Sequence, residues 1–262
     1  MRMSTANTLI GLGALMLASG TQAHQIWYEH TPGQPLTLYY GEYDKNMLEV
    51  TPGGLDRFRQ LKGWSAANPL PAPALGLSLG LQRQSFSVDH QPKADESLLA
   101  QDSQYPLFDL HEGGKTLKTH WTPATRWVGD LRARQPELAL DIVPTGVAAA
   151  GKAQFQVFYE LKPLAAQEVI LETGSGEVFT QTSDQDGKVS FALPWQGTYV
   201  VAAEYKDRTP GTRQGPDSQA EAYDLKSFSS TLSFHQPQGK PPLPRAPATL
   251  PASEVARLKK QS

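Results

Sequence analysis

The feature that most constrains the fold is a series of short segments in which apolar and polar side chains alternate. In the segment AQFQVFYELKP, Phe155, Val157 and Tyr159 share one face, and the other face carries Gln154, Gln156 and Glu160. This period of two is typical of a half-buried β-strand. Comparable segments follow at short spacing, and no amphipathic helix interrupts them. The pattern therefore predicts an antiparallel β-sandwich over residues 137–236.

Two glycine-containing turns add to this prediction. The Asp186-Gly187 pair in SDQDGKV supplies the positive backbone φ that a tight hairpin needs, and so predicts a hairpin between the flanking strands. The Gly113-Gly114 pair in YPLFDLHEGGKTLKTHW predicts a second hairpin. In that hairpin His111 pairs with Thr116.

The rest of the chain is less regular. Residues 24–136 also contain alternating segments, but they are interrupted by a stretch rich in Pro and Gly. Residues 237–262 begin with a Pro-rich tract that favours extended backbone and cannot build a core. We therefore expect an all-β protein of two β-sandwich-like domains, 24–136 and 137–236, followed by a flexible tail. A two-turn helix over ASEVARLKKQS is the alternative for the end of that tail.

The first 23 residues have the organisation of a secretory signal. A short positive start precedes about a dozen apolar residues, and the small residues Thr21 and Ala23 stand at the positions that precede a cut. The apolar stretch is too short to span a bilayer, and no later segment is long enough. We therefore expect cleavage after Ala23, export to the periplasm, and no transmembrane segment in the mature chain. The absence of cysteine means that burial, without disulfides, holds the fold together.

The charge balance restricts the partners. The whole chain has a formal net charge of −2, from 24 basic and 26 acidic residues. Removing residues 1–23 takes away one Arg and no acid, so 23 minus 26 leaves −3. Nucleic-acid surfaces need a basic excess. We therefore expect no nucleic-acid partner.

Several segments together resemble a known family. The start AHQIWYEH, the segment LDIVPTG, the block TSDQDGKVSFALPWQGTYVVAAEY and the closing SSTLSF are similar to the envelope proteins called domain of unknown function 4198. That family is similar to extracytoplasmic components of nickel and cobalt uptake systems. The resemblance implies a periplasmic protein with an immunoglobulin-like C-terminal domain and a role in transition-metal handling. Those nickel-uptake relatives bind metal with a His at the second mature position, whereas here the His is the first, so the local chemistry needs its own argument.

A terminal His24 offers two nitrogens from one residue, the α-amine and the ring Nδ1. Both can bind one metal ion in a chelate ring, and a second imidazole would complete a three-nitrogen face. Such ligands suit Cu(II) first and Ni(II) second, with Co(II) as a further candidate, while the lack of cysteine disfavours thiolate sites. Met47 is the only methionine after residue 23, which excludes a Met-rich copper carrier.

The second ligand is sought among the other histidines. His30 is separated from His24 by six residues of strand, roughly 20 Å, and His235 is expected to face outward in the other unit. His90 lies in a polar loop and stays open. In the predicted hairpin His111 and His120 lie roughly 13 Å apart, so at most one of them joins His24. We favour His120, which is nearer the body of the sheet, over His111 at the hairpin tip.

Three functions follow from these residues. The first is a periplasmic metal-binding protein that handles copper, nickel or cobalt and delivers the ion to a membrane transporter or another envelope protein. The second is a metal-free envelope adaptor. The third is a copper-dependent oxidative enzyme, because polysaccharide-cleaving monooxygenases also begin with His and are β-sandwiches. We find no aromatic stripe for a sugar, no nucleophile elbow and no HExxH motif, and therefore predict that the protein is not an enzyme.

Overall fold

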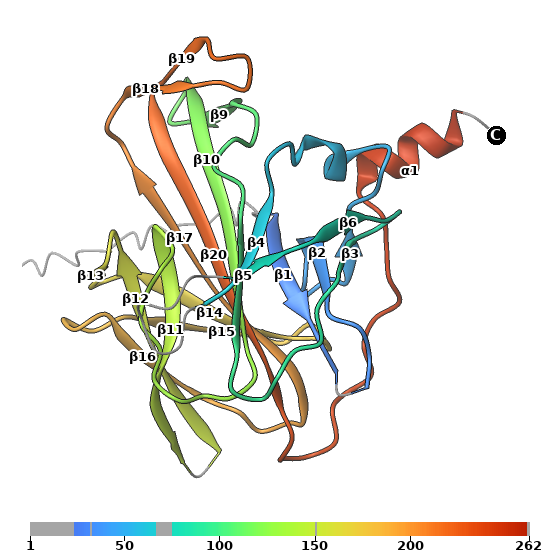
Figure 1. Cartoon of the computed structure of the whole chain (residues 1–262), viewed down its shortest axis with the longest axis vertical. Coiled ribbons are helices and arrows are strands. Elements are labelled where there is room, and N and C mark those ends of the chain that lie inside the picture. Colours follow the sequence, from blue (N-terminus) through green and yellow to red (C-terminus); the bar gives the residue numbers. More distant parts are fainter. Residues whose placement is uncertain (1–23, 32, 67–74, 150, 261–262) are drawn as a thin grey trace, which may run out of the picture.

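The structure is a computed structural model that describes residues 24–31, 33–66, 75–149 and 151–260, and β-strands dominate it (Figure 1). The expected all-β, sandwich-like class is confirmed. The expected signal peptide lies outside the described residues. Within the described ranges, no helix has both the length and the apolar character that crossing a bilayer requires.

A sheet of nine strands, here called the central sheet, runs through the whole molecule (Figure 1). Its order is β15-β14-β17-β20-β10-β8-β4-β5, and β9 pairs with the outer part of β10. The strands are β4 (Lys62–Ser65), β5 (Leu75–Leu77), β8 (Ser97–Gln101), β9 (Phe108–Glu112), β10 (Lys115–Val128), β14 (Glu168–Thr173), β15 (Val178–Thr182), β17 (Gly197–Asp207) and β20 (Leu225–Gln236).

Two smaller sheets cover the central sheet. The first outer sheet consists of β1 (Gln25–Glu29), β2 (Thr37–Glu42), β3 (Met47–Leu48), β6 (Leu79–Leu81) and β7 (Phe86–Val88). The second outer sheet consists of β11 (Leu140–Ala149), β12 (Lys152–Tyr159), β13 (Lys162–Pro163) and β16 (Lys188–Ala192). A separate hairpin is formed by β18 (Gly211–Gln214) and β19 (Ala220–Tyr223). The helices are the 3₁₀ turn η1 (Gly54–Arg57) and α1 (Ala252–Lys259).

The two outer sheets lie on opposite faces of the central sheet, and β20 shows why. Phe228, Leu232 and Phe234 pack in one apolar core with the second outer sheet. The alternating residues face the other way, where the Thr231 hydroxyl donates to the carbonyl of Ile26 at 2.7 Å. His235, which we expected to face outward, belongs to this alternating set, and β1 covers the face at Thr231. A strand covered on both faces is buried along its whole middle.

The boundary expected between residues 136 and 137 falls inside a continuous structure. β10 and β20 pair side by side in parallel, with Thr119 opposite Leu225 and Trp127 opposite Ser233. We expected an antiparallel sandwich, but this pair of strands is parallel. The two expected units also share one sheet. The separation into two domains stays a prediction.

The two glycine turns have different outcomes. The Gly113-Gly114 hairpin is confirmed, with φ angles of 57° and 73° and with His111 opposite Thr116. The turn at Gly187 also forms, and its φ is 75°. It does not join a hairpin, because β15 pairs with β14 in the central sheet while β16 pairs with β12 in the second outer sheet. The Asp184 side chain holds this turn by accepting from the backbone N–H of Lys188 at 2.8 Å.

The expected flexible tail is attached to the first outer sheet in the part that the structure describes. The backbone N–H of Leu48 donates to the carbonyl of Thr249 at 3.0 Å, and the Asn46 side chain donates to the carbonyl of Ala246 at 2.6 Å. Arg245 forms an ion pair with Glu29 at 2.6 Å. α1 follows and lies above β1 to β3 (Figure 1). We call residues 245–259 the strap. It is not the flexible tail that we expected, because Asn46 and Leu48 at the β3 edge supply polar partners, and the alternative of a short helix at its end is present as α1.

A buried ion pair fixes the passage from β10 to β11. The Arg126 guanidinium binds both carboxylate oxygens of Asp141, at 3.1 and 2.6 Å, and neither side chain is exposed. The Asp141 carboxylate also accepts from the backbone N–H groups of Glu137 and Leu138. Because every charge here has partners, removing one of them would leave a buried charge unpaired.

Candidate functional site

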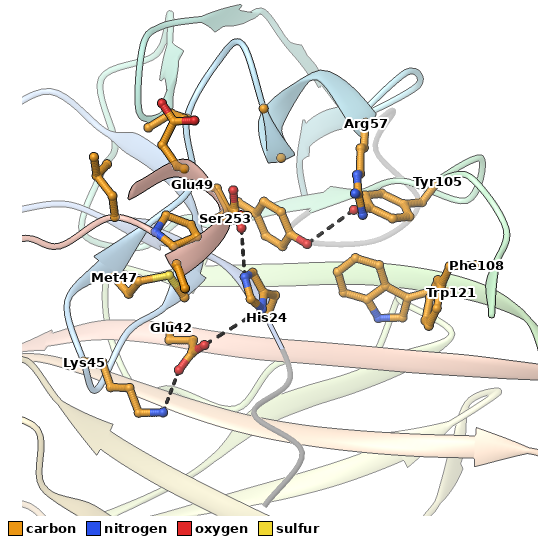
Figure 2. A pocket seen from close by; sticks show the side chains of 18 of the residues that line it. His24, Glu42, Lys45, Met47, Glu49, Arg57, Tyr105, Phe108, Trp121 and Ser253 are labelled. Carbon is orange, nitrogen blue, oxygen red and sulfur yellow. Dashed lines mark hydrogen bonds and ion pairs between the residues drawn. The ribbon is translucent and has the colours of Figure 1, made fainter. Parts of the chain in front are cut away.

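A groove with a volume of about 1020 Å³ opens between the first outer sheet, the outer part of β10, and the strap. Its wall combines aromatic rings with charged side chains. Figure 2 shows His24, Glu42 and Met47 at one end, with Trp121 and Phe108 at the other. Because pockets of this size that combine apolar walls with a few polar groups commonly bind small ligands, the groove is the candidate site.

His24 lies at one end of the groove, immediately before β1. Its Nε2 is 2.9 Å from Glu49 Oε1, and its Nδ1 is 4.0 Å from Glu42 Oε1. The ring packs against Tyr40, with 5.3 Å between centroids. The His24 side chain is 31% exposed, so it is both held by the protein and reachable from the groove. An ionised carboxylate only accepts hydrogen bonds, so Nε2 is the donor in the contact with Glu49.

The strand geometry explains why two carboxylates meet at His24. β2 and β3 are antiparallel, with Glu42 opposite Met47, and the backbone N–H of Glu49 donates to the carbonyl of Tyr40. Residues two apart on a strand share a face. Tyr40, Glu42, Met47 and Glu49 therefore all face the groove. The tight turn between the strands includes Asn46 at a φ of 47°.

The other end of the groove is an aromatic wall. The Tyr105 and Trp121 rings meet edge to face with 4.7 Å between centroids, and the Tyr105 hydroxyl is 3.3 Å from that of Tyr40. Burial raises the pKa of Tyr40 above its ordinary value. Arg57, at the end of η1, lies beside Tyr105 in Figure 2. A hydrogen bond with the Tyr105 hydroxyl raises the pKa of the Arg57 guanidinium.

A buried carboxyl lies next to this site. Glu172 on β14 is 5% exposed and accepts from the side chain of Gln25, the residue after His24, at 2.6 Å. The pKa of Glu172 is raised to about 7, mainly by burial, while the hydrogen bond from Gln25 acts against this rise and the nearby carboxylates of Asp44 and Glu42 act with it. The His24 end of the groove is therefore surrounded by acidic groups.

The structure does not bring His120 or His111 to His24. His120 Nε2 lies 3.0 Å from the carbonyl of Ser103, and its ring packs on Tyr223. Burial lowers the pKa of His120. On β10 the neighbours Thr119 and Trp121 line the groove, so the strand alternation turns His120 to the opposite face. His111 is at the hairpin, 3.0 Å from the Thr116 hydroxyl.

Two of the three remaining histidines, His30 and His90, also have surroundings of their own. His30 packs edge to face on Trp127, with 5.5 Å between centroids, and His90 Nε2 is 2.8 Å from Glu96 Oε2. Throughout the described part of the chain, no group of three or more His, Asp or Glu side chains is arranged to hold a metal ion. Side chains alone therefore do not form a metal centre here.

Sequence reasoning missed Glu42 and Glu49 at the His24 end and Arg57 and Tyr105 at the aromatic end. One signal was present in the sequence. The segment YYGEYDKNMLEV places Tyr40 and Glu42, and then Met47 and Glu49, each pair two residues apart on either side of the turn-forming residues DKN. No comparable signal exists for Arg57 or Tyr105, because neither pairs in sequence with the other residues of the groove.

Comparison with protein families gives a match over part of the chain. Residues 115–207 match the model of a family described as a domain of unknown function (DUF4198). No curated protein matches the chain. The matched range contains the segments LDIVPTG and TSDQDGKVSFALPWQGTYVVAAEY, whereas AHQIWYEH and SSTLSF lie outside it. The match supports the resemblance to this family over about a third of the chain.

Proposed function

We propose that the protein is a periplasmic transition-metal-binding protein that holds the ion at His24. Three donors support this proposal. If the chain is cut after Ala23, His24 supplies its α-amine and ring Nδ1, and the Glu42 carboxylate lies 4.0 Å from that Nδ1. A small movement of either side chain would bring the Glu42 oxygen to the same ion.

The observation that carries the proposal is the contact between His24 Nε2 and Glu49, at 2.9 Å. Metal-binding histidines usually donate their second ring N–H to such an acceptor, which fixes the ring and its tautomer. Here the contact uses Nε2. It leaves Nδ1 for the metal, and Nδ1 is the ring nitrogen that can form a chelate with an amine on the same residue.

The donor set favours a particular metal. Two nitrogens and a carboxylate oxygen suit Cu(II), then Ni(II) and Co(II), in the usual order of affinity. The amine is essential to this set, because the side chains of the described residues do not form a metal centre without it. A periplasmic location and delivery of the ion to a membrane transporter belong to the same proposal.

The experiment compares two forms of the protein. One begins at His24, and the other carries a single additional Ala before it, which moves the amine away from the imidazole. We expect the first to bind one Cu(II), with Ni(II) weaker, and the second to lose at least tenfold in affinity in a competition titration. Affinity should fall as the pH falls, because protons compete for the nitrogen lone pairs. Equal affinity of the two forms would refute the proposal.

Two substitutions sharpen the test. Glu49→Gln should lower the affinity by about 10-fold, because the neutral amide oxygen is a weaker acceptor for the imidazole N–H than the carboxylate is. His111→Ala is the matched control, because His111 is exposed and alternates with Phe108 and Leu110, which line the groove while His111 does not, and it should leave the affinity unchanged. If His111→Ala weakened binding as much as Glu49→Gln does, copper would be bound somewhere other than His24. Mass analysis of protein isolated from its native envelope checks the cut after Ala23.

A further inference from the structure

The groove is much larger than a metal ion needs. Its volume of about 1020 Å³ is at the upper end of the range of pockets that hold whole organic molecules. The His24 end accounts for only one side of it, and the aromatic wall lines the other (Figure 2). A metal ion at His24 would therefore not account for the aromatic end of the groove.

The aromatic wall is held rigidly. The Trp121 indole N–H donates to the Ser229 hydroxyl at 3.0 Å, and the Trp121 ring packs against Tyr105. Phe108 on β9 lines the same end of the groove and is 36% exposed. Aromatic rings prefer edge-to-face or offset contacts with other rings. A planar aromatic ligand matches this wall, because its faces and edges would meet rings that are already fixed.

Charge selects the polar group of that ligand. Lys45 pairs with Glu42 at 2.7 Å, and Lys206 pairs with Glu112 at 3.0 Å. Arg57 differs from these groove cations, because within the described ranges no carboxylate forms an ion pair with it. Its guanidinium lies beside the Tyr105 hydroxyl. A guanidinium binds a carboxylate through two parallel hydrogen bonds.

The acidic side chains of the groove restrict the charge of the ligand. Glu42 and Glu254 are paired with Lys45 and Arg257, whereas among the described residues no Lys or Arg forms an ion pair with Glu49 or Glu204. A phosphate or a polycarboxylate would be repelled by these groups, whereas one carboxylate at Arg57 is matched by one cation. We propose that the end of the groove formed by Arg57, Tyr105, Phe108 and Trp121 binds an aromatic monocarboxylate, with the carboxylate on Arg57 and the ring on the aromatic wall. This inference does not depend on a metal at His24.

The test uses the full mature chain, treated with a chelator so that no metal is present. The probe is naphthalene-2-carboxylate, and calorimetry measures its affinity. We expect one molecule bound per chain, and weaker binding of two comparison compounds. The first is 2-naphthamide, which has the ring but no charge, and the second is cyclohexanecarboxylate, which has the charge but no aromatic ring.

Substitutions locate the binding. Arg57→Gln should weaken binding of the probe at least tenfold, the usual effect of losing a charged hydrogen-bond partner. Arg59→Gln is the matched control two residues away; Arg59 does not line this groove, and its substitution should change nothing. Phe108→Ala should weaken the binding of the probe more than it weakens the binding of cyclohexanecarboxylate.

Three results would overturn the inference. They are no saturable binding of naphthalene-2-carboxylate, equal affinity for the probe and 2-naphthamide, and equal affinity of the Arg57→Gln and wild-type proteins. Because all measurements are made without metal, failure of the metal proposal leaves them unaffected. Conversely, failure of the carboxylate site leaves the comparison of the two N-terminal forms intact.

Discussion

The two faces of the central sheet differ in what covers them. On one face, the second outer sheet closes over a core of aliphatic and aromatic side chains that includes Phe155, Val201 and Leu232. On the other face, the first outer sheet meets tyrosines and tryptophans whose polar atoms pair with each other and with Ser229. This second face opens into the groove. The central sheet therefore has a closed side that stabilises the protein and an open side whose polar and aromatic side chains line the groove.

The family match follows this division. Residues 115–207 include all strands of the second outer sheet and four strands of the central sheet, β10, β14, β15 and β17. β1 to β3, η1 and the strap lie outside the match, and they supply His24, Glu42, Glu49 and Arg57. The match therefore concerns mainly the closed side and says little about the ligand of the open side.

The largest expected effect comes from the closed side. Phe155→Ala should lower the free energy of unfolding by about 3–5 kcal/mol, because the side chain is fully buried and its removal leaves a cavity against Phe234. Denaturant unfolding measures it. Copper affinity of the folded variant should stay the same. A loss below about 1 kcal/mol would mean that this core is loosely packed.

The next effect is a pH dependence of stability that comes from Glu172 on β14. Glu172 has its pKa raised to about 7 by burial, so between about pH 5 and 7 the folded protein keeps a proton that the unfolded chain releases. Stability therefore falls as the pH rises through this window. Glu172→Gln should be more stable than the wild type at pH 8 by about 2–3 kcal/mol, and should lack this fall.

Glu168→Gln is the matched control, because Glu168 is an exposed residue of the same strand. Thermal unfolding at several pH values compares the three proteins. If the wild type and Glu172→Gln have parallel stability curves from pH 5 to 8, then Glu172 is ionised in the fold.

The third effect comes from the open side. Deleting residues 245–262 removes the strap bonds to Asn46 and Leu48 and should lower the free energy of unfolding by about 1–3 kcal/mol, since each hydrogen bond contributes about 1 kcal/mol net. Deleting only residues 261–262 is the control. A stability unchanged by the larger deletion would show that the strap does not hold β3.

The smallest effect is expected at Phe108, and we compare it with the effect of the same substitution at Phe155. Phe108→Ala should change the free energy of unfolding by less than about 1 kcal/mol, because the side chain is 36% exposed at the groove. The same change at Phe155 is expected to cost several times more. Thermal unfolding of both variants in one buffer makes the comparison. Equal losses would contradict the division into a closed and an open side.

The sequence by itself determined the strand content and several local structures. The alternation of Phe155 and Val157 with polar neighbours predicted a half-buried strand, and β12 is one. The Gly113-Gly114 pair fixed a hairpin and its register, because a two-residue turn with positive φ leaves one way to pair the strands. The sequence also singled out His24 from the pattern that ends at Ala23. These features depend on residues close together in the chain.

The tertiary structure decided which surfaces meet. A period of two shows that a strand has two faces, but not what covers each, and so the buried second face of β20 around Thr231 was not predictable. The same holds for His120. The sequence placed His120 and Trp121 on opposite faces of one strand. Only the packing showed that the face with Trp121 lines the groove. The groove joins His24, Arg57, Trp121 and the strap, which are far apart in sequence, because pairing between distant strands depends on the complementarity of whole sheets and not on any local pattern.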